Sequence, residues 1–199
     1  MLTSDEIERM AQQMDIPVAF IGFKDELPKK LEYNKTYIIN QEDHINNEGE
    51  ANAGSHWTGF QVNHYHNGKV EGIYFDSYGS GYSKIIKSLI KSNFGIVIPH
   101  TTKDIQSLMN NACGWYVLAF FHFINGQYKS GNLYNDTETF LSMFNDLNEK
   151  IDFKQNEYIL KHFFQPKDPA LRKAIDVISD PEAIDGEGIS SIPCEIKYK

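Results

Sequence analysis

The feature that most constrains the fold is an almost wholly apolar run from Cys113 to Ile124, which reads CGWYVLAFFHFI. Apolar residues would occupy nearly every side of a helix with this sequence, and such a helix is buried at the centre of a protein. We therefore expect the rest of the chain to surround a central helix over residues 112–125. A polar turn, QSLMNN, occupies residues 106–111. Cys113 is thus expected at the N-terminus of the central helix.

Length and composition agree with a single domain built around such a helix. The chain has 199 residues, of which 41% are hydrophobic and 13% aromatic, as in globular proteins. No run approaches the ~18 apolar residues of a membrane span, and the polar N-terminus has no signal-peptide apolar region. The only cysteines, Cys113 and Cys194, favour an intracellular, reducing compartment over a disulfide framework. The net charge of −8 disfavours binding to DNA or other nucleic acid.

The expected elements are strands in runs, with separate helices. Helical spacing occurs over 3–14 (capped by Thr3 or Ser4), 81–92, 136–149 and 155–165; strand-like runs occur over 34–40, over 94–100 and on both sides of Asn67-Gly68. This order favours an α+β fold over a βαβ series. We expect one domain over 1–165, in which a small mixed or antiparallel sheet packs on the central helix. Residues 166–199 would be a C-terminal extension packed on the same domain.

Cys113 has a structural and a chemical interpretation. Free cysteine is among the most buried residue types, so a core residue is the simpler one. A thiol at a helix N-terminus, however, feels the positive end of the helix dipole, which favours the thiolate. Gly114 would let a substrate backbone approach closely, and the N–H groups at the helix start point where an oxyanion would form.

The hairpin around Asn67-Gly68 decides whether a histidine and an acid lie together. His56 begins its first strand and Asp76 ends its second. A two-residue turn would place the two side chains on opposite faces. A three-residue loop over 66–68, with Gly68 in the left-handed region of a G1 bulge, places them on one face and diagonal to each other. We predict this bulged hairpin, with Nδ1–H of His56 donating to Asp76.

These residues form a candidate catalytic set. Asp76 would orient His56 and stabilise its imidazolium, and His56 would deprotonate Cys113, as in nucleophilic acyl transfer. Gln106 precedes Cys113 by seven residues and is a candidate side-chain donor to the tetrahedral oxyanion. Taken singly, each of the four has an ordinary structural explanation.

Taken in order, the residues resemble a known family. Its pattern is Gly-x-His-Trp, an acid closing the next strand, a glutamine, and Cys-Gly opening the central helix; here these are Gly54 to Trp57, Asp76, Gln106 and Cys113-Gly114. This pattern, over roughly residues 35–164, resembles the adenain-type cysteine proteases. They comprise the adenovirus maturation protease and its relatives in large DNA viruses and virophages, and share a clan with the SUMO-specific proteases.

The resemblance implies a papain-like or adenain-like α+β fold and a thiol protease that cleaves beside glycine, at Gly-x-Gly or Gly-Gly type sites. It implies an oxyanion hole of Gln106, Cys113 and Gly114, and substrate contacts at Ser55 and Trp57. It further implies processing of capsid precursors during virion maturation, by a protein that works in the host cell and is packaged in the virion. We expect that protein to be a monomer. No metal or other certain cofactor is implied.

The chain departs from the family in charge and in its activating peptide. Adenain is basic, uses DNA as a cofactor and is activated by a cysteine-containing peptide, whereas this chain is acidic and lacks an evident partner cysteine. Its tail contains Ile184 to Glu187 followed by Gly188, which fits the cleavage pattern that the resemblance implies. We hypothesise that residues 188–199 are a built-in activating segment that adds to a sheet edge, that Glu187–Gly188 is a self-cleavage site, or both. An ordinary polar tail is the alternative.

Three other functions use the same residues differently. A deconjugase of ubiquitin-like or SUMO-like modifiers would use the same triad and the same preference for Gly-Gly. A cysteine-dependent acetyltransferase would also use it, but needs an acetyl donor and an anion site that the sequence does not show. A non-catalytic scaffold would bury Cys113 as an inert thiol.

Overall fold

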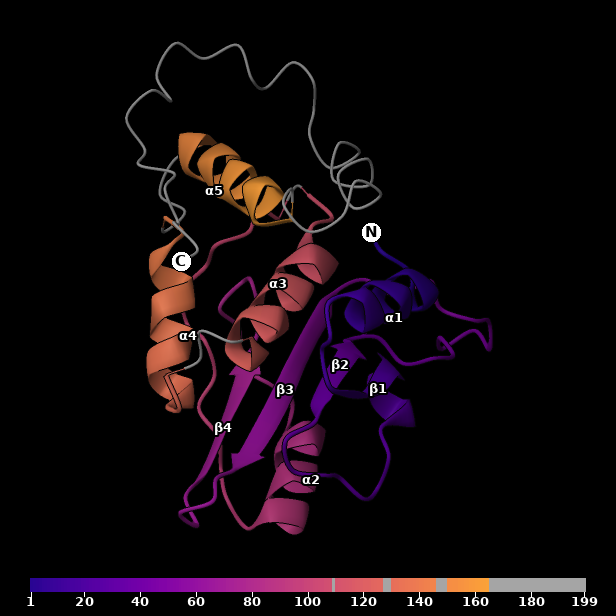
Figure 1. Ribbon diagram of the computed structural model, residues 1–199. Helices are drawn as coiled ribbons and strands as arrows, with labels where there is room; N and C mark the ends of the chain where they lie inside the picture. The colour runs from indigo at the N-terminus through magenta and orange to yellow at the C-terminus, as the bar shows by residue number, and fades with distance from the viewer. Residues whose placement is uncertain (109, 127–129, 146–149, 165–199) are drawn as a thin grey trace.

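Figure 1 shows the computed structural model, which describes residues 1–108, 110–126, 130–145 and 150–164. The fold is mixed α+β, as expected, with a four-stranded sheet and five α-helices among these residues. The helices are α1 (Ser4–Gln13), α2 (Lys84–Phe94), α3 (Cys113–Asn125), α4 (Leu133–Ser142) and α5 (Lys150–Phe164). The strands are β1 (Val18–Phe23), β2 (Thr36–Asn40), β3 (Trp57–His64) and β4 (Val70–Phe75), with a short 3-10 turn η1 (Lys24–Glu26) after β1.

The sheet lies between two groups of helices. Its order is β1-β2-β3-β4, with β1 and β2 parallel and the other neighbours antiparallel. Because side chains alternate along a strand, each central strand contributes to two cores. α3 packs on one face against Ile38 and Phe75, and α2 packs on the other against Phe60 and Tyr74. The α3 face carries the larger core.

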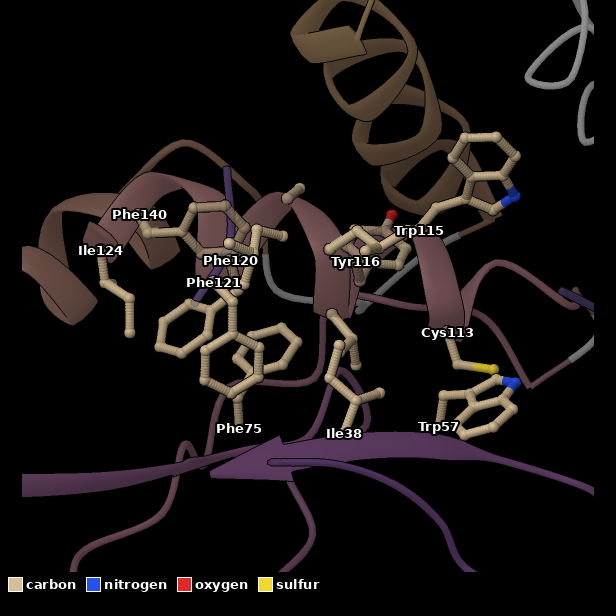
Figure 2. Close-up of a cluster of buried hydrophobic side chains, with 14 of the residues drawn as sticks. Ile38, Trp57, Phe75, Cys113, Trp115, Tyr116, Phe120, Phe121, Ile124 and Phe140 are labelled. Atoms are coloured by element: carbon tan, nitrogen blue, oxygen red, sulfur yellow. The ribbon is translucent and has the colours of Figure 1, made fainter. Parts of the chain in front are cut away.

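α3 is the buried central helix that its apolar run predicts. Ten of its 13 residues are buried. Figure 2 shows Phe120 and Phe121 pointing at the sheet, where Phe75 stacks on Phe120 with ring centroids 4.3 Å apart. Burying one such side chain stabilises the fold by about 1.5–3 kcal/mol, so α3 has a firmly determined place over β3 and β4. Cys113, its first residue, is positioned with it.

The hairpin between β3 and β4 has the predicted three-residue loop. The Tyr65 N–H donates to the Lys69 carbonyl at 2.9 Å, and the Gly68 N–H donates to the Tyr65 carbonyl at 2.9 Å. Gly68 has a φ of 81°, the left-handed conformation of a G1 bulge. Gly59 consequently pairs with Phe75. Continued by one residue, this register places His56 diagonal to Asp76, so the prediction of a bulged hairpin is confirmed.

Two strand assignments differ from expectation. Residues 94–100 were expected as a strand, and this is wrong: Phe94 ends α2, and Gly95, with a φ of 72°, caps it in the left-handed region. Beyond Gly95 the described chain makes one bridge, Tyr74 with His100, because Pro99 has no N–H and contributes only its carbonyl. β1 is not among the expected strands, and its parallel pairing with β2 is a non-local contact.

The expected helices form with shifted ends. Thr3 caps α1 through a capping box with Glu6, as predicted. α4 starts at Leu133 rather than 136, because the Asn132 side chain accepts hydrogen bonds from the next turn. α5 starts at Lys150 rather than 155. The expected C-terminal extension, residues 166–199, lies outside the described residues.

Candidate active site

His56 and Asp76 meet at the ends of β3 and β4. His56 Nε2 lies 2.7 Å from Asp76 Oδ1, and the exposed fractions of the two side chains are 13% and 4%. The diagonal contact is the one that the hairpin register predicts, but the nitrogen differs: Nδ1 was expected to face the acid, and Nε2 does. In this orientation Nδ1 is the nitrogen left on the side of Cys113, which begins the neighbouring helix.

Asp76 is held by groups on both sides. Its Oδ1 also accepts the backbone N–H of Tyr78 at 2.9 Å. Its own backbone N–H donates to the Thr101 hydroxyl at 3.0 Å, and that hydroxyl lies 3.0 Å from the Asp76 carbonyl. Thr101 follows the bridge between Tyr74 and His100, so the segment along the edge of β4 braces the acid. These bonds fix the position of Asp76 at the end of β4.

The second nitrogen of His56 is turned inward without a partner. Nδ1 is buried and has no partner within hydrogen-bond distance among the described residues, while the Cys113 thiol lies close enough to affect the His56 pKa. Burial lowers that pKa, but the hydrogen bond to Asp76, the nearby Cys113 sulfur and the charge of Asp76 outweigh burial and raise it to about 9. The imidazole is therefore set to hold a proton beside the sulfur at neutral pH.

Cys113 begins α3 and is 2% exposed. In Figure 2 its sulfur lies at the end of the buried cluster where Trp57 lies. The N–H groups of Trp115 and Tyr116 donate to the Ala112 carbonyl, whereas those of Cys113 and Gly114 donate to no other group within the described residues. Two backbone donors are thus available beside the thiol, which is where an oxyanion needs them.

Gln106 is fully buried next to this set, and its amide is engaged. Its Oε1 accepts the Ser77 hydroxyl at 2.6 Å. Its Nε2 contacts the Asn110 carbonyl at 3.1 Å, Asn110 Oδ1 at 2.9 Å and the Tyr78 hydroxyl at 3.3 Å. An amide nitrogen has two hydrogens, so donation to a substrate would require Gln106 to exchange one of these contacts. Its role in the oxyanion hole stays a prediction.

The two predicted substrate contacts occupy different environments. Ser55 is exposed, and its hydroxyl donates to Glu42 at 2.5 Å. Trp57 is 2% exposed, and its indole N–H donates to the Leu2 carbonyl at 2.8 Å. The Leu2 side chain also covers Gly114, where an added Cβ would lie 3.1 Å from it. Both substrate roles stay predictions, and the candidate cleavage site at Glu187 and Gly188 lies outside the described residues.

Tyr78 is a site residue that was not expected. Its ring stacks on His56 with centroids 4.3 Å apart and an interplanar angle of 21°. Burial raises the pKa of Tyr78 to about 12, with contributions from the charges of Cys113 and Asp76. Its hydroxyl therefore stays protonated. The signal was present in the sequence, since the register that puts Asp76 diagonal to His56 puts Tyr78 directly opposite.

Within the described part of the chain, no group of three His, Cys, Asp or Glu side chains is arranged to hold a metal ion. None of the helices described there is both long and apolar enough to span a membrane.

Comparisons with known proteins add no assignment. No protein-family model matches the chain, and no curated protein matches it significantly. The chemistry of the site must therefore be argued from its geometry.

Proposed function

We propose that the chain is a cysteine endopeptidase of the adenain type, with a papain-like arrangement of helix and sheet. The observation that carries the proposal is the position of His56. One ring nitrogen is bonded to the buried Asp76, and the other is buried, unpartnered and next to the thiol of Cys113. A histidine between an acid and a helix-terminal thiol has the arrangement of a thiol nucleophile with its base.

The proposed reaction follows from these positions. In the reactive form the Cys113 proton has passed to His56 Nδ1, and the thiolate attacks the scissile carbonyl carbon. The backbone N–H groups of Cys113 and Gly114, which have no acceptor among the described residues, donate to the resulting oxyanion, joined by Gln106 if it releases Asn110. The imidazolium then gives its proton to the leaving amine as the C–N bond breaks. Water, deprotonated by His56, hydrolyses the thioester and restores the thiol.

The substrate follows from the family resemblance. We propose cleavage beside glycine at Gly-x-Gly or Gly-Gly type sites in capsid precursors during virion maturation, with Ser55 and Trp57 on the substrate side. The enzyme would act as a monomer in the reducing interior of a host cell and then be packaged, without DNA as a cofactor, since its net charge is −8.

The test combines a thiol probe with cleavage. We would treat the wild type, Cys113→Ala and His56→Ala with a vinyl sulfone ending in a Gly-x-Gly sequence, and assay hydrolysis of the matching peptide. We expect labelling of Cys113 that requires His56, and cleavage that requires both residues, with kcat reduced by at least about 10³-fold in either variant.

Two other outcomes would change the proposal. Rapid cleavage of a ubiquitin-like or SUMO-like conjugate, with capsid-type peptides left intact, would replace the endopeptidase with a deconjugase. An unlabelled Cys113 in wild type, together with no hydrolysis of either substrate, would contradict a catalytic thiol altogether.

A further inference from the structure

The segment that joins Gln106 to Cys113 is fastened to α5 by two consecutive residues. Asn156 is fully buried, and its Nδ2 donates to the Ile105 carbonyl at 3.0 Å. Glu157 Oε1 accepts a hydrogen bond from Asn110 Nδ2. One contact therefore lies just before Gln106 and the other shortly before Cys113. α5 contributes no residue to the candidate triad. It nevertheless forms hydrogen bonds with both ends of the segment that leads to Cys113.

Asn110 connects Glu157 to the residues of the candidate site through hydrogen bonds. Asn110 Nδ2 donates to Glu157, and Asn110 Oδ1 accepts two hydrogen bonds. One comes from Gln106 Nε2 at 2.9 Å and the other from the Ala112 N–H at 3.2 Å. Ala112 is the residue before Cys113 and the cap of α3. The orientation of one amide therefore determines where the Gln106 side chain lies and where the first N–H groups of α3 point.

The opposite side of the segment is anchored to the end of β4. The N–H groups of Ile105 and Gln106 both donate to the Ser77 carbonyl, at 2.9 and 3.2 Å, and the Ser77 hydroxyl holds Gln106 Oε1. Ser77 is the neighbour of Asp76. The segment that leads to the oxyanion donors is therefore held from two sides. Ser77, next to Asp76 at the end of β4, holds one side, and α5, which lies farther from the thiol, holds the other.

We propose that Glu157, acting through Asn110, is a positioning residue for the oxyanion donors at the start of α3. This inference rests on the proposed function, because it assigns a role to the donors of that reaction. Burial raises the pKa of the Glu157 carboxyl, which favours its neutral form. A glutamine has the shape of a neutral glutamic acid and keeps an acceptor oxygen, so Glu157→Gln should preserve the contact and Glu157→Ala should remove it.

The experiment measures the contribution of the oxyanion donors separately from the reactivity of the thiol. A peptide aldehyde ending in a Gly-x-Gly sequence adds to the thiol to give a tetrahedral adduct whose oxygen needs those donors. Alkylation of Cys113 by iodoacetamide displaces iodide and forms no such oxygen, so its rate reports only the thiolate and its imidazolium partner. We would measure both, with kcat, KM and Tm, in the wild type and the variants.

We expect Glu157→Ala to lower kcat and aldehyde affinity by about tenfold or more, short of the 10²–10³-fold loss on removing an oxyanion donor outright. KM and the alkylation rate should stay within about twofold, because the thiol pair is untouched. Glu157→Gln should have kcat and aldehyde affinity close to those of the wild type. Leu160→Ala, which removes a buried core contact of α5, should lower Tm without these kinetic changes.

The outcomes are distinguishable from failure of the proposed function. A wild-type thiol that is neither rapidly alkylated nor hydrolytic would overturn the function and this inference together. An active wild type whose kcat and aldehyde affinity are unchanged in Glu157→Ala would overturn this inference alone. An increase in kcat would also overturn it, and would mean that Asn110 withholds Gln106 from the substrate. Should Glu157→Ala fail to fold, Asn110→Ala in the partly exposed segment decides by the same measurements.

Discussion

Asp76 is the residue whose hydrogen bond and charge do most to keep the proton on His56. With its pKa raised to about 9, the imidazole of His56 stays protonated at neutral pH and loses its proton above pH 9. The peptidase should therefore have an upper pH limb of kcat/KM near 9. Asp76→Asn keeps a hydrogen-bonding side chain but removes the charge, so the limb should move down by about 1 pH unit or more. A pH–rate profile measures both values.

The same pKa has a consequence for stability. A folded-state pKa above the ordinary 6.5 of histidine stabilises the folded protein fully below about pH 6.5, and this contribution is lost as pH rises through 9. Tm of the wild type should fall across that window, and Asp76→Asn should flatten the fall.

The pH–rate profile also has an outcome that would contradict this role of Asp76. An upper limb of kcat/KM that stays near 9 in Asp76→Asn would mean that another group, and not Asp76, holds the proton on His56.

The residues of the site were predictable where local geometry determines them. Loop length and the left-handed preference of Gly68 set the register, and the register brings His56 to Asp76. The choice of Nε2 over Nδ1 was not predictable, because the ring orientation depends on a helix more than fifty residues away in sequence. The engagement of Gln106 by Asn110 was not predictable for the same reason.

At the scale of elements, the contact between β3 and α3 determines how far the thiol lies from its base. Gly59 of β3 permits this contact: an added Cβ would lie 2.5 Å from Phe121 Cε2 and 2.7 Å from the Tyr37 carbonyl. A backbone carbonyl in a sheet cannot withdraw, so Gly59→Ala must shift α3 or the strands. We expect a loss of about 1–3 kcal/mol in the free energy of unfolding, as for other overpacked cores.

Activity should respond as well, because moving α3 moves Cys113 away from His56. kcat should fall in Gly59→Ala even where the protein is fully folded, as measured by peptide hydrolysis alongside urea unfolding. Gly81→Ala is the matched control: it is exposed, its Cβ would make an ordinary 3.5 Å contact with His100, and it should change stability by less than about 0.5 kcal/mol. A Gly59→Ala variant with wild-type kcat would show that the site tolerates movement of α3.

Among the elements, those with a strong local pattern were predictable. The apolar run of α3 and the capping signal at Thr3 identify helices whatever surrounds them. β1 was missed because a short apolar run becomes a strand only through pairing with β2, and residues 94–100 were misassigned because β-branched residues there run beside β4 without continuing the sheet.

At the scale of the whole molecule, the candidate site belongs to no single element. His56 precedes β3, Asp76 and Tyr78 follow β4, Cys113 opens α3, and α5 holds the segment before it. These parts are distant in sequence and meet only when the sheet is packed between its helices. The sequence predicts the members of the candidate triad because all three lie at the ends of strongly patterned elements. It predicts the helix that becomes α5 but not the contacts of α5 with the segment before Cys113, because a supporting contact leaves no local pattern.

Because the site is assembled from distant parts of the chain, its activity should be lost only when the whole domain unfolds. We expect the urea midpoint for loss of peptide hydrolysis to coincide with the midpoint for loss of helical circular dichroism, because a domain of this size usually unfolds in one cooperative transition. Inactivation at clearly lower urea would show that α5, or the segment from Gln106 to Cys113, opens separately while the sheet and α3 remain packed. Circular dichroism recorded beside peptide hydrolysis at each urea concentration distinguishes the two, because the helical signal is lost in full only in the global transition.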